Sequence, residues 1–341
     1  MKLRKVFLAA VAGAVALTLA ACGSKSEDSC EACNGSEIAS SAVASSASAS
    51  ESANLTSYPL TLTTYDNTSS EVSQTYNEVP TRVICNNVSS AKTMIDLGLE
   101  KYIIGMPNPD NTVTDSYKEK IDAITKLGDK KTLSKEVIVS YEPDIIVGRV
   151  AMFSSSLMGT VDELNSYDIN VYSQASSIKT ANVENIAADI RNLGKIFNVQ
   201  DKAEELALKV EEKVAALGST DSTEYKNALV MCNFNNTTFG AYKSTLQEKM
   251  LNKIGYTNVA TGTSGLSLEN LVSMNPEVII YVTSDRNATV DATAVENLKS
   301  NDAISEVPAI VNNKIITVGY DDFMEYGANV IDTLATIKAA I

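Results

Sequence analysis

One fifteen-residue pattern occurs twice in this chain, and it limits the possible folds more than any other feature. Residues 133–147 read LSKEVIVSYEPDIIV and residues 266–280 read LSLENLVSMNPEVII, with seven of the fifteen positions identical and no gap. Glu136 of the first copy matches Glu269 of the second. Because the copies are 133 residues apart, the repeat predicts two examples of one folding unit.

The segments around the two copies predict the same order of elements in each half. Short apolar strands are expected in the first half at 82–85, 102–104, 144–147 and 169–172. Their counterparts in the second half are expected at 228–232, 258–260, 278–282 and 315–318. A strand hairpin is expected at 58–76, and helices such as 89–97 and 244–254 separate the strands. Strands that alternate with helices predict parallel sheets covered by helices. We therefore predict an α/β fold of two Rossmann-like lobes with parallel-type sheets.

Residues 201–218, DKAEELALKVEEKVAALG, predict one long helix that joins the two lobes. Asp201 is the expected N-cap and Gly218 the expected stop, and apolar residues recur at helical spacing between them. A single connecting helix limits how far two lobes can swing apart. The predicted parts of the chain are a signal peptide (1–21), a tether (22–57), an N-terminal lobe (58–180), a helical segment (181–218) and a C-terminal lobe (219–341).

The first residues predict export. Basic residues precede the apolar run 6–19, which is too short for the roughly 20 residues of a membrane-spanning helix. The run ends in Leu-Ala-Ala-Cys, so cleavage before Cys22 and acylation of its thiol would leave a lipid-anchored protein. The alternative is an ordinary secretory signal with a chance cysteine. The Ser- and Ala-rich tether contains the motif SCEAC with Cys30 and Cys33, which we interpret as an incidental disulfide or as unreactive thiols.

Composition excludes several functional classes. The chain has 28 Lys and Arg against 42 Asp and Glu, a net charge of −14, which argues against nucleic acid or an anionic membrane surface as a partner. It contains no His, so imidazole metal sites and His-dependent catalysis are excluded. We expect a binding protein rather than an enzyme, with no metal site and no intrinsic cofactor.

These features together resemble the helical-backbone (class III) solute-binding proteins of ABC importers, which serve ferric siderophores, haem and cobalamin. The resemblance covers residues 58–341, and its most specific motifs are TRVICNN at 81–87, the two LSxE segments and the connecting helix. It implies a ligand cleft between the lobes that closes by a small hinge motion. It also implies a protein held at the extracytoplasmic face of the cell membrane by its lipid alone, which we expect to be a monomer.

The resemblance gives the repeated glutamates a role. In this family an acidic residue on the outer surface of each lobe pairs with arginines of the permease dimer, and Glu136 and Glu269 match those positions by motif. Each follows an expected N-cap, Ser134 or Ser267, so the simpler interpretation is a carboxylate stabilised by a helix N-terminus. Both interpretations hold together, because two equivalent carboxylates suit a two-fold partner.

Two arginines are the main candidates for ligand binding. Arg149 follows the strand DIIVG, and Arg286 follows VIIYVTSD in the repeat. Ligands of α/β sheets gather beyond the carboxyl ends of strands, and guanidinium groups suit anionic oxygen. Lys243 is a possible third cation. The set resembles the basic cluster of ferric-catecholate binders, although their usual Gly-Ser-Arg is replaced here by Tyr242-Lys243-Ser244. The alternative is a pair of surface arginines bonded to nearby acids.

Aromatic and amide residues complete the predicted site. Tyr320 follows the strand IITVG, and Tyr326 lies nearby. Since tyrosine ligates haem in some family members, haem is the alternative ligand, and cobalamin is less favoured because its carriers tend to use Trp. Hydrogen bonds at the cleft rim are expected from four residues, some of them plain loop residues: Asn86, Asn87, Asn235 and Asn236. We predict a lipoprotein that delivers a ferric siderophore, catecholate-like, to an ABC permease; a chelatase-like enzyme is the remote alternative.

Overall fold

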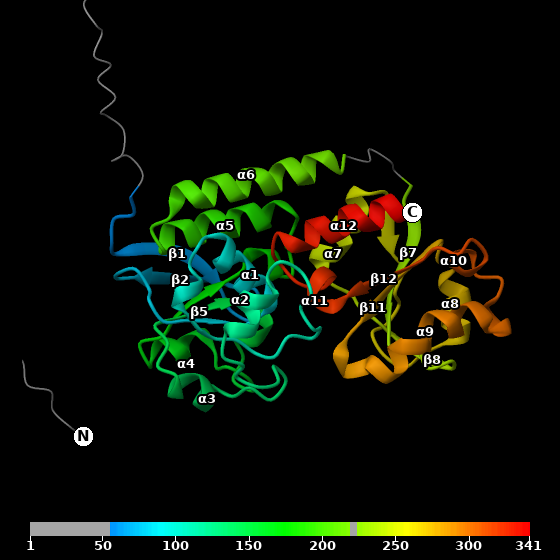
Figure 1. Ribbon diagram of the computed structural model, residues 1–341, viewed down its shortest axis with the longest axis horizontal. Coiled ribbons are helices and arrows are strands. Elements are labelled where there is room, and N and C mark those ends of the chain that lie inside the picture. Colours follow the sequence, from blue (N-terminus) through cyan, green and yellow to red (C-terminus); the bar gives the residue numbers. More distant parts are fainter. Residues whose placement is uncertain (1–54, 219–223) are drawn as a thin grey trace, which may run out of the picture. The chain divides into compact units, whose positions relative to one another are not determined.

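The computed structural model describes residues 55–218 and 224–341 (Figure 1). The predicted signal peptide, the predicted lipidation site Cys22, the SCEAC motif and most of the predicted tether lie outside the described residues. Across the two described ranges, none of the helices is both long and apolar enough to cross a membrane.

The first lobe is built on a parallel four-stranded sheet with the order β4-β3-β5-β6. Its strands are β3 (Val83–Cys85), β4 (Ile103–Gly105), β5 (Ile145–Gly148) and β6 (Asn170–Ser173). The predicted hairpin is confirmed as the antiparallel pair β1 (Leu60–Tyr65) and β2 (Glu71–Tyr76), which packs against β6. The helices of this lobe are α1 (Val88–Asp96), α2 (Lys118–Ala123), α3 (Lys135–Ser140), α4 (Val161–Asn165) and α5 (Glu184–Ile196).

The second lobe repeats this plan and extends it. Its six-stranded sheet has the order β10-β8-β7-β11-β12, with β9 also paired to β7. The strands are β7 (Lys226–Cys232), β8 (Thr238–Ala241), β9 (Tyr256–Asn258), β10 (Leu266–Ser267), β11 (Val278–Thr283) and β12 (Ile315–Gly319). Pairs β7-β8 and β8-β10 are antiparallel, so the predicted parallel sheet gains an antiparallel edge. The strand expected at 258–260 is β9, two residues earlier, because its register is set by pairing with β7.

Short helices cover the second sheet, and single turns link several elements. The helices are α7 (Thr245–Lys253), α8 (Leu268–Met274), α9 (Ala288–Ser300), α10 (Pro308–Val311), α11 (Tyr320–Phe323) and α12 (Asn329–Ala340). The 3₁₀ turns are η1 (Glu100–Tyr102), η2 (Val150–Met152), η3 (Ala175–Ser177), η4 (Asp285–Asn287) and η5 (Asp302–Ile304). The two repeated segments become α3 followed by β5 and α8 followed by β11, which confirms that the repeat marks equivalent units.

The connecting helix is α6 (Gln200–Ala216), which lies along α5 and reaches toward the second lobe (Figure 1). The prediction of Asp201 as N-cap is wrong, because Val199 holds that position and its carbonyl accepts the Ala203 N–H at 3.0 Å. The first turns of α6 pack closely against α5: a Cβ on Gly194 of α5 would lie 2.3 Å from the Ala203 Cβ. Lys213 of α6 bonds Asp332 of α12 at 2.7 Å, so α6 is attached to both lobes.

The repeated strands carry the cores of the two lobes. Ile145 and Ile146 of β5, and Ile279 and Ile280 of β11, are fully buried, as strands covered by helices on both faces require. The pairing runs to the last residue of each strand, where Gly148 pairs with Ser173 and Thr283 with Gly319. The residues that follow these two strand ends are therefore held by a rigid sheet.

Candidate site between the lobes

Arg149 leaves the end of β5 in a position fixed by its backbone. The Arg149 N–H donates to the Asn86 Oδ1 at 2.8 Å, and the Asn86 amide donates back to the Arg149 carbonyl at 3.1 Å. The preceding Gly148 has φ 153°, and a Cβ there would lie 1.9 Å from the same Oδ1. Asn86 is fully buried. Its amide oxygen and amide nitrogen each bond the loop that carries Arg149. The predicted hydrogen bond from Asn86 to a ligand stays a prediction.

The Arg149 guanidinium is buried between the lobes with few partners. Arg149 is only 9% exposed, and its Nη1 donates to the Tyr320 hydroxyl at 3.2 Å. Its Nε is buried and has no hydrogen-bond partner among the described residues. Burial alone would lower the pKa of Arg149, but Tyr320, Glu325 and Tyr326 favour the cation and the net pKa is raised. A charged group with an unused donor therefore lies inside the protein.

Tyrosines and a second cation surround Arg149. Tyr320 begins α11, and its ring lies 5.6 Å from that of Tyr242 in an edge-to-face arrangement at 64°. The Lys130 ammonium lies 4.2 Å from the centre of the Tyr320 ring and is ion-paired with Asp110. Burial and the nearby Arg149 lower the pKa of Lys130. The sequence analysis missed Lys130, because it lies in the polar loop 128–131 where nothing distinguishes it from a solvated charge.

Arg286, the counterpart of Arg149 in the repeat, has a different environment. Its Nε donates to the Asp110 carboxylate at 2.8 Å, its Nη1 is paired with Asp129, and its side chain is 25% exposed. Both carboxylates belong to the first lobe, whereas Arg286 belongs to the second. The structure therefore places this arginine in a bond between lobes, with its charge already neutralised.

The segment 110–112 of the first lobe continues this bond along the second lobe. The Asp285 N–H donates to the Asp110 carbonyl at 2.8 Å, and the Asn111 N–H donates to the Asp321 carboxylate at 2.8 Å. The Thr112 N–H and hydroxyl each donate to the Asp285 carboxylate at 2.8 Å. We call these bonds, together with those of Arg286, the cross-lobe clasp.

Two buried carboxylates complete the site. Asp321 is 3% exposed and Glu325 is 1% exposed. Glu325 Oε2 accepts hydrogen bonds from the Asn87 amide at 2.5 Å and from the Ser89 hydroxyl at 3.1 Å, both in the first lobe. Burial, with the adjacent Glu325 charge, raises the pKa of Asp321 to about 7. Both acids closely follow Tyr320, which the sequence analysis singled out, so their place in the chain was a usable signal.

We call Lys130, Arg149, Tyr320, Asp321 and Glu325 the interlobe site. The cavity that Lys130, Asp321 and Glu325 line has a volume of only about 10 Å³, about the space of one water molecule. A ligand larger than water can therefore enter only when the lobes move apart.

Of the other predicted site residues, Lys243 and Asn235 lie on the surface and Asn87 is buried. Lys243 is exposed. Asn235 accepts bonds from Thr237 and Thr238 within its own turn, as a plain loop residue does. Asn87 caps α1 through a bond to the Ser90 N–H at 3.2 Å and also contacts Glu325.

Glu136 and Glu269 are both exposed near the starts of α3 and α8. Hydrogen bonds from Ser134 and Ser267, respectively, lower the pKa of each carboxyl. Both carboxylates therefore stay ionised on equivalent outer surfaces.

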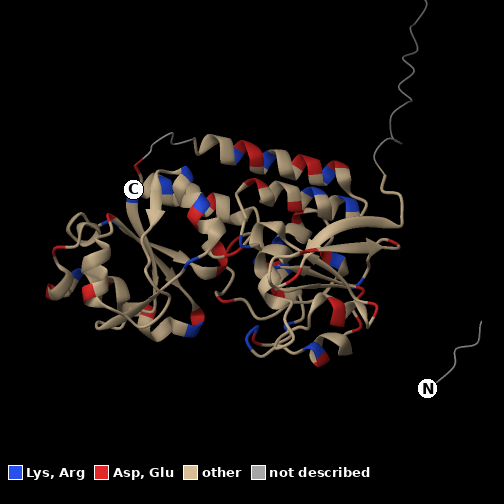
Figure 2. Ribbon diagram, turned by 180° about the vertical axis from the view of Figure 1, so that it is seen from behind, with Lys and Arg blue, Asp and Glu red and all other residues tan. Residues whose placement is uncertain are grey.

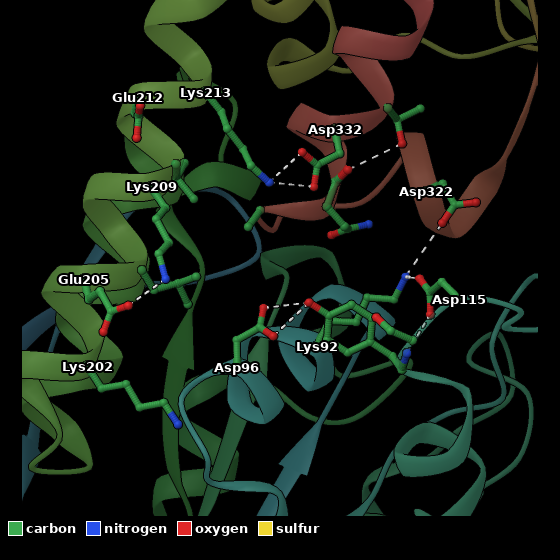
Figure 3. Close-up of a pocket in the computed structure, with 17 residues that line it drawn as sticks. Lys92, Asp96, Asp115, Lys202, Glu205, Lys209, Glu212, Lys213, Asp322 and Asp332 are labelled. Atoms are coloured by element: carbon green, nitrogen blue, oxygen red, sulfur yellow. Dashed lines mark hydrogen bonds and ion pairs between the residues drawn. The ribbon is translucent and has the colours of Figure 1, made fainter.

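A separate cavity of about 670 Å³ lies beside α6 and spans both lobes (Figure 3). Its walls carry four lysines and six acidic residues, and several of these charges are already paired, as in Lys92–Asp115, Lys209–Glu205 and Lys213–Asp332. Basic and acidic positions are mixed along α6 (Figure 2). A net acidic wall does not suit an anionic ligand, so this cavity is a poor alternative to the interlobe site.

Comparison with known proteins agrees with this geometry. The family model described as "Periplasmic binding protein" matches residues 83–321, from β3 to the start of α11. The chain belongs to the periplasmic binding protein family. The Bacillus subtilis ABC transporter substrate-binding lipoprotein YvrC is 21% identical over 271 residues, covering 78% of this chain and 82% of that protein. The petrobactin-binding protein YclQ of the same organism is 22% identical, covering 70% and 74% of the two chains.

Solved structures show the same fold. This periplasmic binding protein aligns with an Fe³⁺-hydroxamate transport protein of Saccharomonospora viridis at a TM-score of 0.66 and 22% identity, covering 83% and 99% of the two chains. It aligns with the haem-binding protein RhuT of Roseiflexus at a TM-score of 0.60 and 18% identity, covering 76% and 97%. At these identities the likeness shows the α/β fold with its two lobes and leaves the ligand to the chemistry of the site.

Proposed function

We propose that this periplasmic binding protein captures a ferric siderophore between its lobes and delivers it to the permease of an ABC importer, without chemical change to the ligand. The observation that carries the proposal is the Arg149 guanidinium, buried between two lobes with an unused Nε donor. A buried cation beside tyrosines suits an anionic, oxygen-rich, planar group. The names of related proteins specify petrobactin, an Fe³⁺-hydroxamate and haem, which supports an iron chelate.

Within this class we propose a catecholate-like chelate. Phenolate oxygens bonded to iron carry negative charge for Arg149 and Lys130, and the catechol rings can lie against Tyr320 and Tyr242. The siderophore would supply all the iron ligands.

The test is a titration of the purified protein with three iron compounds: a ferric catecholate, a ferric hydroxamate and haem. Intrinsic tyrosine fluorescence is a clean signal because the chain has 14 Tyr and no Trp. Saturable quenching by the catecholate at micromolar concentration or below supports the proposal. Absence of binding by all three compounds contradicts it.

Haem is the second candidate, favoured by the Tyr242–Tyr320 pair next to Arg149. Burial raises the pKa of Tyr320 and the Arg149 guanidinium acts against that rise, while tyrosinate is a known haem ligand. The distinguishing result is a shift of the Soret band that is lost in Tyr320→Phe. Quenching by the catecholate without such a shift excludes haem.

We also propose that the protein acts as a monomer anchored by lipid outside the cytoplasm, and that Glu136 and Glu269 dock it to the two permease subunits. Docking through these residues is supported by their equivalence, since both are exposed, ionised and near the starts of repeated helices. Reversing both charges to Lys should abolish uptake by cells while leaving ligand affinity unchanged. Exposed Glu296 of α9, changed to Lys, is the control, and normal uptake by the double variant would contradict docking through these residues.

A further inference from the structure

Glu325 reaches out of the second lobe to the start of a helix in the first. It follows α11, and its carboxylate accepts hydrogen bonds from the side chains of Asn87 and Ser89. Asn87 is the N-cap of α1 and Ser89 lies in its first turn. The N-terminus of a helix carries partial positive charge and favours an anion. Glu325 therefore supplies from one lobe the anion that the other lobe is arranged to bind.

Two cations lie near Glu325. Lys130 and Glu325 both line the cavity of about 10 Å³. Arg149 lies close enough for the Glu325 charge to favour its protonated form, and its Nε is buried without a partner among the described residues. The start of α1, two neutral donors and two cations thus lie near the Glu325 carboxylate.

In the described residues, neutral donors rather than an ion pair hold the Glu325 carboxylate. Within the part of the chain that the structure describes, no ion pair of 4 Å or less joins Glu325 to Lys130 or Arg149. The side-chain bonds from Asn87 and Ser89 to its carboxylate come from neutral donors in the other lobe, so separation of the lobes breaks both. The donors of α1 and the unused Arg149 Nε then become available together to a different anion.

We infer that Glu325 stands in for a carboxylate of the ligand, which takes its place at Asn87, Ser89 and Arg149 when the lobes separate. This inference rests on the proposed function and narrows it: the bound chelate carries a free carboxylate in addition to the groups that hold its iron. Glu325 is then an internal competitor that keeps the site filled until such a chelate arrives.

A matched pair of probes tests this point, the ferric complexes of catechol and of 3,4-dihydroxybenzoate, which differ only by free carboxylates. Isothermal titration calorimetry should show that the wild-type protein binds the carboxylate-bearing complex more tightly. Glu325→Gln keeps the shape of the side chain and removes its charge. It should tighten binding of the dihydroxybenzoate complex about tenfold and that of the catechol complex by less than about twofold. Ser89→Ala removes one donor and should reduce the preference for the carboxylate.

The control is Asp322→Asn, which removes an exposed charge from the same helix α11 and should leave the preference unchanged. Equal gains for both probes in Glu325→Gln, or no gain for either, would overturn the inference, since Glu325 would then only close the lobes. If Glu325→Gln does not fold, Ser89→Ala decides: an undiminished carboxylate preference overturns the inference.

A separate measurement distinguishes failure of this inference from failure of the proposed function. Iron-free catechol and 3,4-dihydroxybenzoate are compared by the thermal unfolding of Glu325→Gln. Saturable stabilisation by dihydroxybenzoate alone supports the carboxylate site even if neither iron complex binds, which would reject the iron chelate as cargo. Binding of both iron complexes without any carboxylate preference would instead reject the carboxylate site and retain the proposed function.

Discussion

Arg149 and Arg286 follow equivalent strands of a repeated unit, yet the structure uses them differently. Arg149 is 9% exposed and its guanidinium bonds the neutral Tyr320 hydroxyl. Arg286 has a 25% exposed side chain and pairs with two carboxylates of the other lobe, Asp110 and Asp129. Arg149 and Arg286 hold equivalent positions in the fold, yet they differ in how available their guanidinium groups are to a ligand.

The acids near the two arginines differ in the same way. Asp110 is paired with two cations, Arg286 and Lys130. Asp321 accepts the Asn111 N–H, and its other oxygen is buried without a partner among the described residues. The charges around Arg286 are therefore paired within the protein. Near Arg149, the Nε donor of Arg149 and one carboxylate oxygen of Asp321 have no hydrogen-bond partner among the described residues. Uncompensated buried groups cost stability, and their retention is typical of functional sites.

The largest expected effect comes from Arg149. Arg149→Met keeps much of the side-chain volume and removes the charge, so affinity for the ferric chelate should fall about 100-fold or more, as for other buried charged contacts. Thermal stability should also fall, because, despite burial, Tyr320, Glu325 and Tyr326 raise the pKa of Arg149 and so favour its charged form in the folded protein. Titration and thermal unfolding measure both quantities. Arg191→Met, which breaks ion pairs between α5 and α6, is the control and should retain affinity. Unchanged affinity in Arg149→Met would remove the distinction between the two arginines.

Arg286→Gln should have a smaller effect, and on the lobes rather than on the ligand. Its loss leaves the buried Asp110 with Lys130 alone, which weakens the cross-lobe clasp by about 1–2 kcal/mol. The amide protons of Asn111, Thr112 and Asp285 all donate within the clasp. Their hydrogen exchange should accelerate about tenfold, while ligand affinity changes by less than about fivefold. Amides of β5 provide the internal reference. A loss of affinity as large as that of Arg149→Met would show that Arg286 binds the ligand directly.

The sequence predicted the position of Arg149 because that position is a local consequence of the fold. A buried strand, a glycine and the rule that ligands gather at carboxyl ends of strands are all readable within a few residues. The same reasoning placed Arg286 and gave pairing with nearby acids as the alternative, but it could not identify those acids. Its partners Asp110 and Asp129 lie in first-lobe loops without regular periodicity, and only the packing of the lobes brings them to it.

Glu325 shows the same limit more sharply. It contacts Asn87 from 238 residues away in the sequence, and neither residue has a local pattern that indicates the other. The antiparallel edge of the second sheet was missed for a different reason. Strands β8 and β10 have only four and two residues, too few to show alternation of apolar and polar side chains. The repeat predicted what the lobes share, and the differences between the lobes came from contacts outside it.

The smallest effect is a pH dependence, and it tests whether Asp321 is as uncompensated as its contacts indicate. Its pKa in the folded protein is about 7 against an ordinary value of 3.8. The folded state therefore holds this proton more tightly than the unfolded state does. The resulting stability is present below pH 3.8 and is lost as the pH rises through about 7.

Between pH 6 and pH 8, the wild-type protein should lose about 1 kcal/mol more unfolding free energy than Asp321→Asn, since one pKa unit corresponds to about 1.4 kcal/mol. Urea unfolding at both values measures the difference. The raised pKa of buried Asp189, about 6, acts in the same direction but is common to both proteins and cancels.

Asp110→Asn is the contrasting variant. It removes the partner of two cations and should destabilise the protein at both pH values. Equal pH dependence in wild type and Asp321→Asn would mean that Asp321 finds a compensating partner, and the contrast between the two sides of the interface would then rest on the arginines alone.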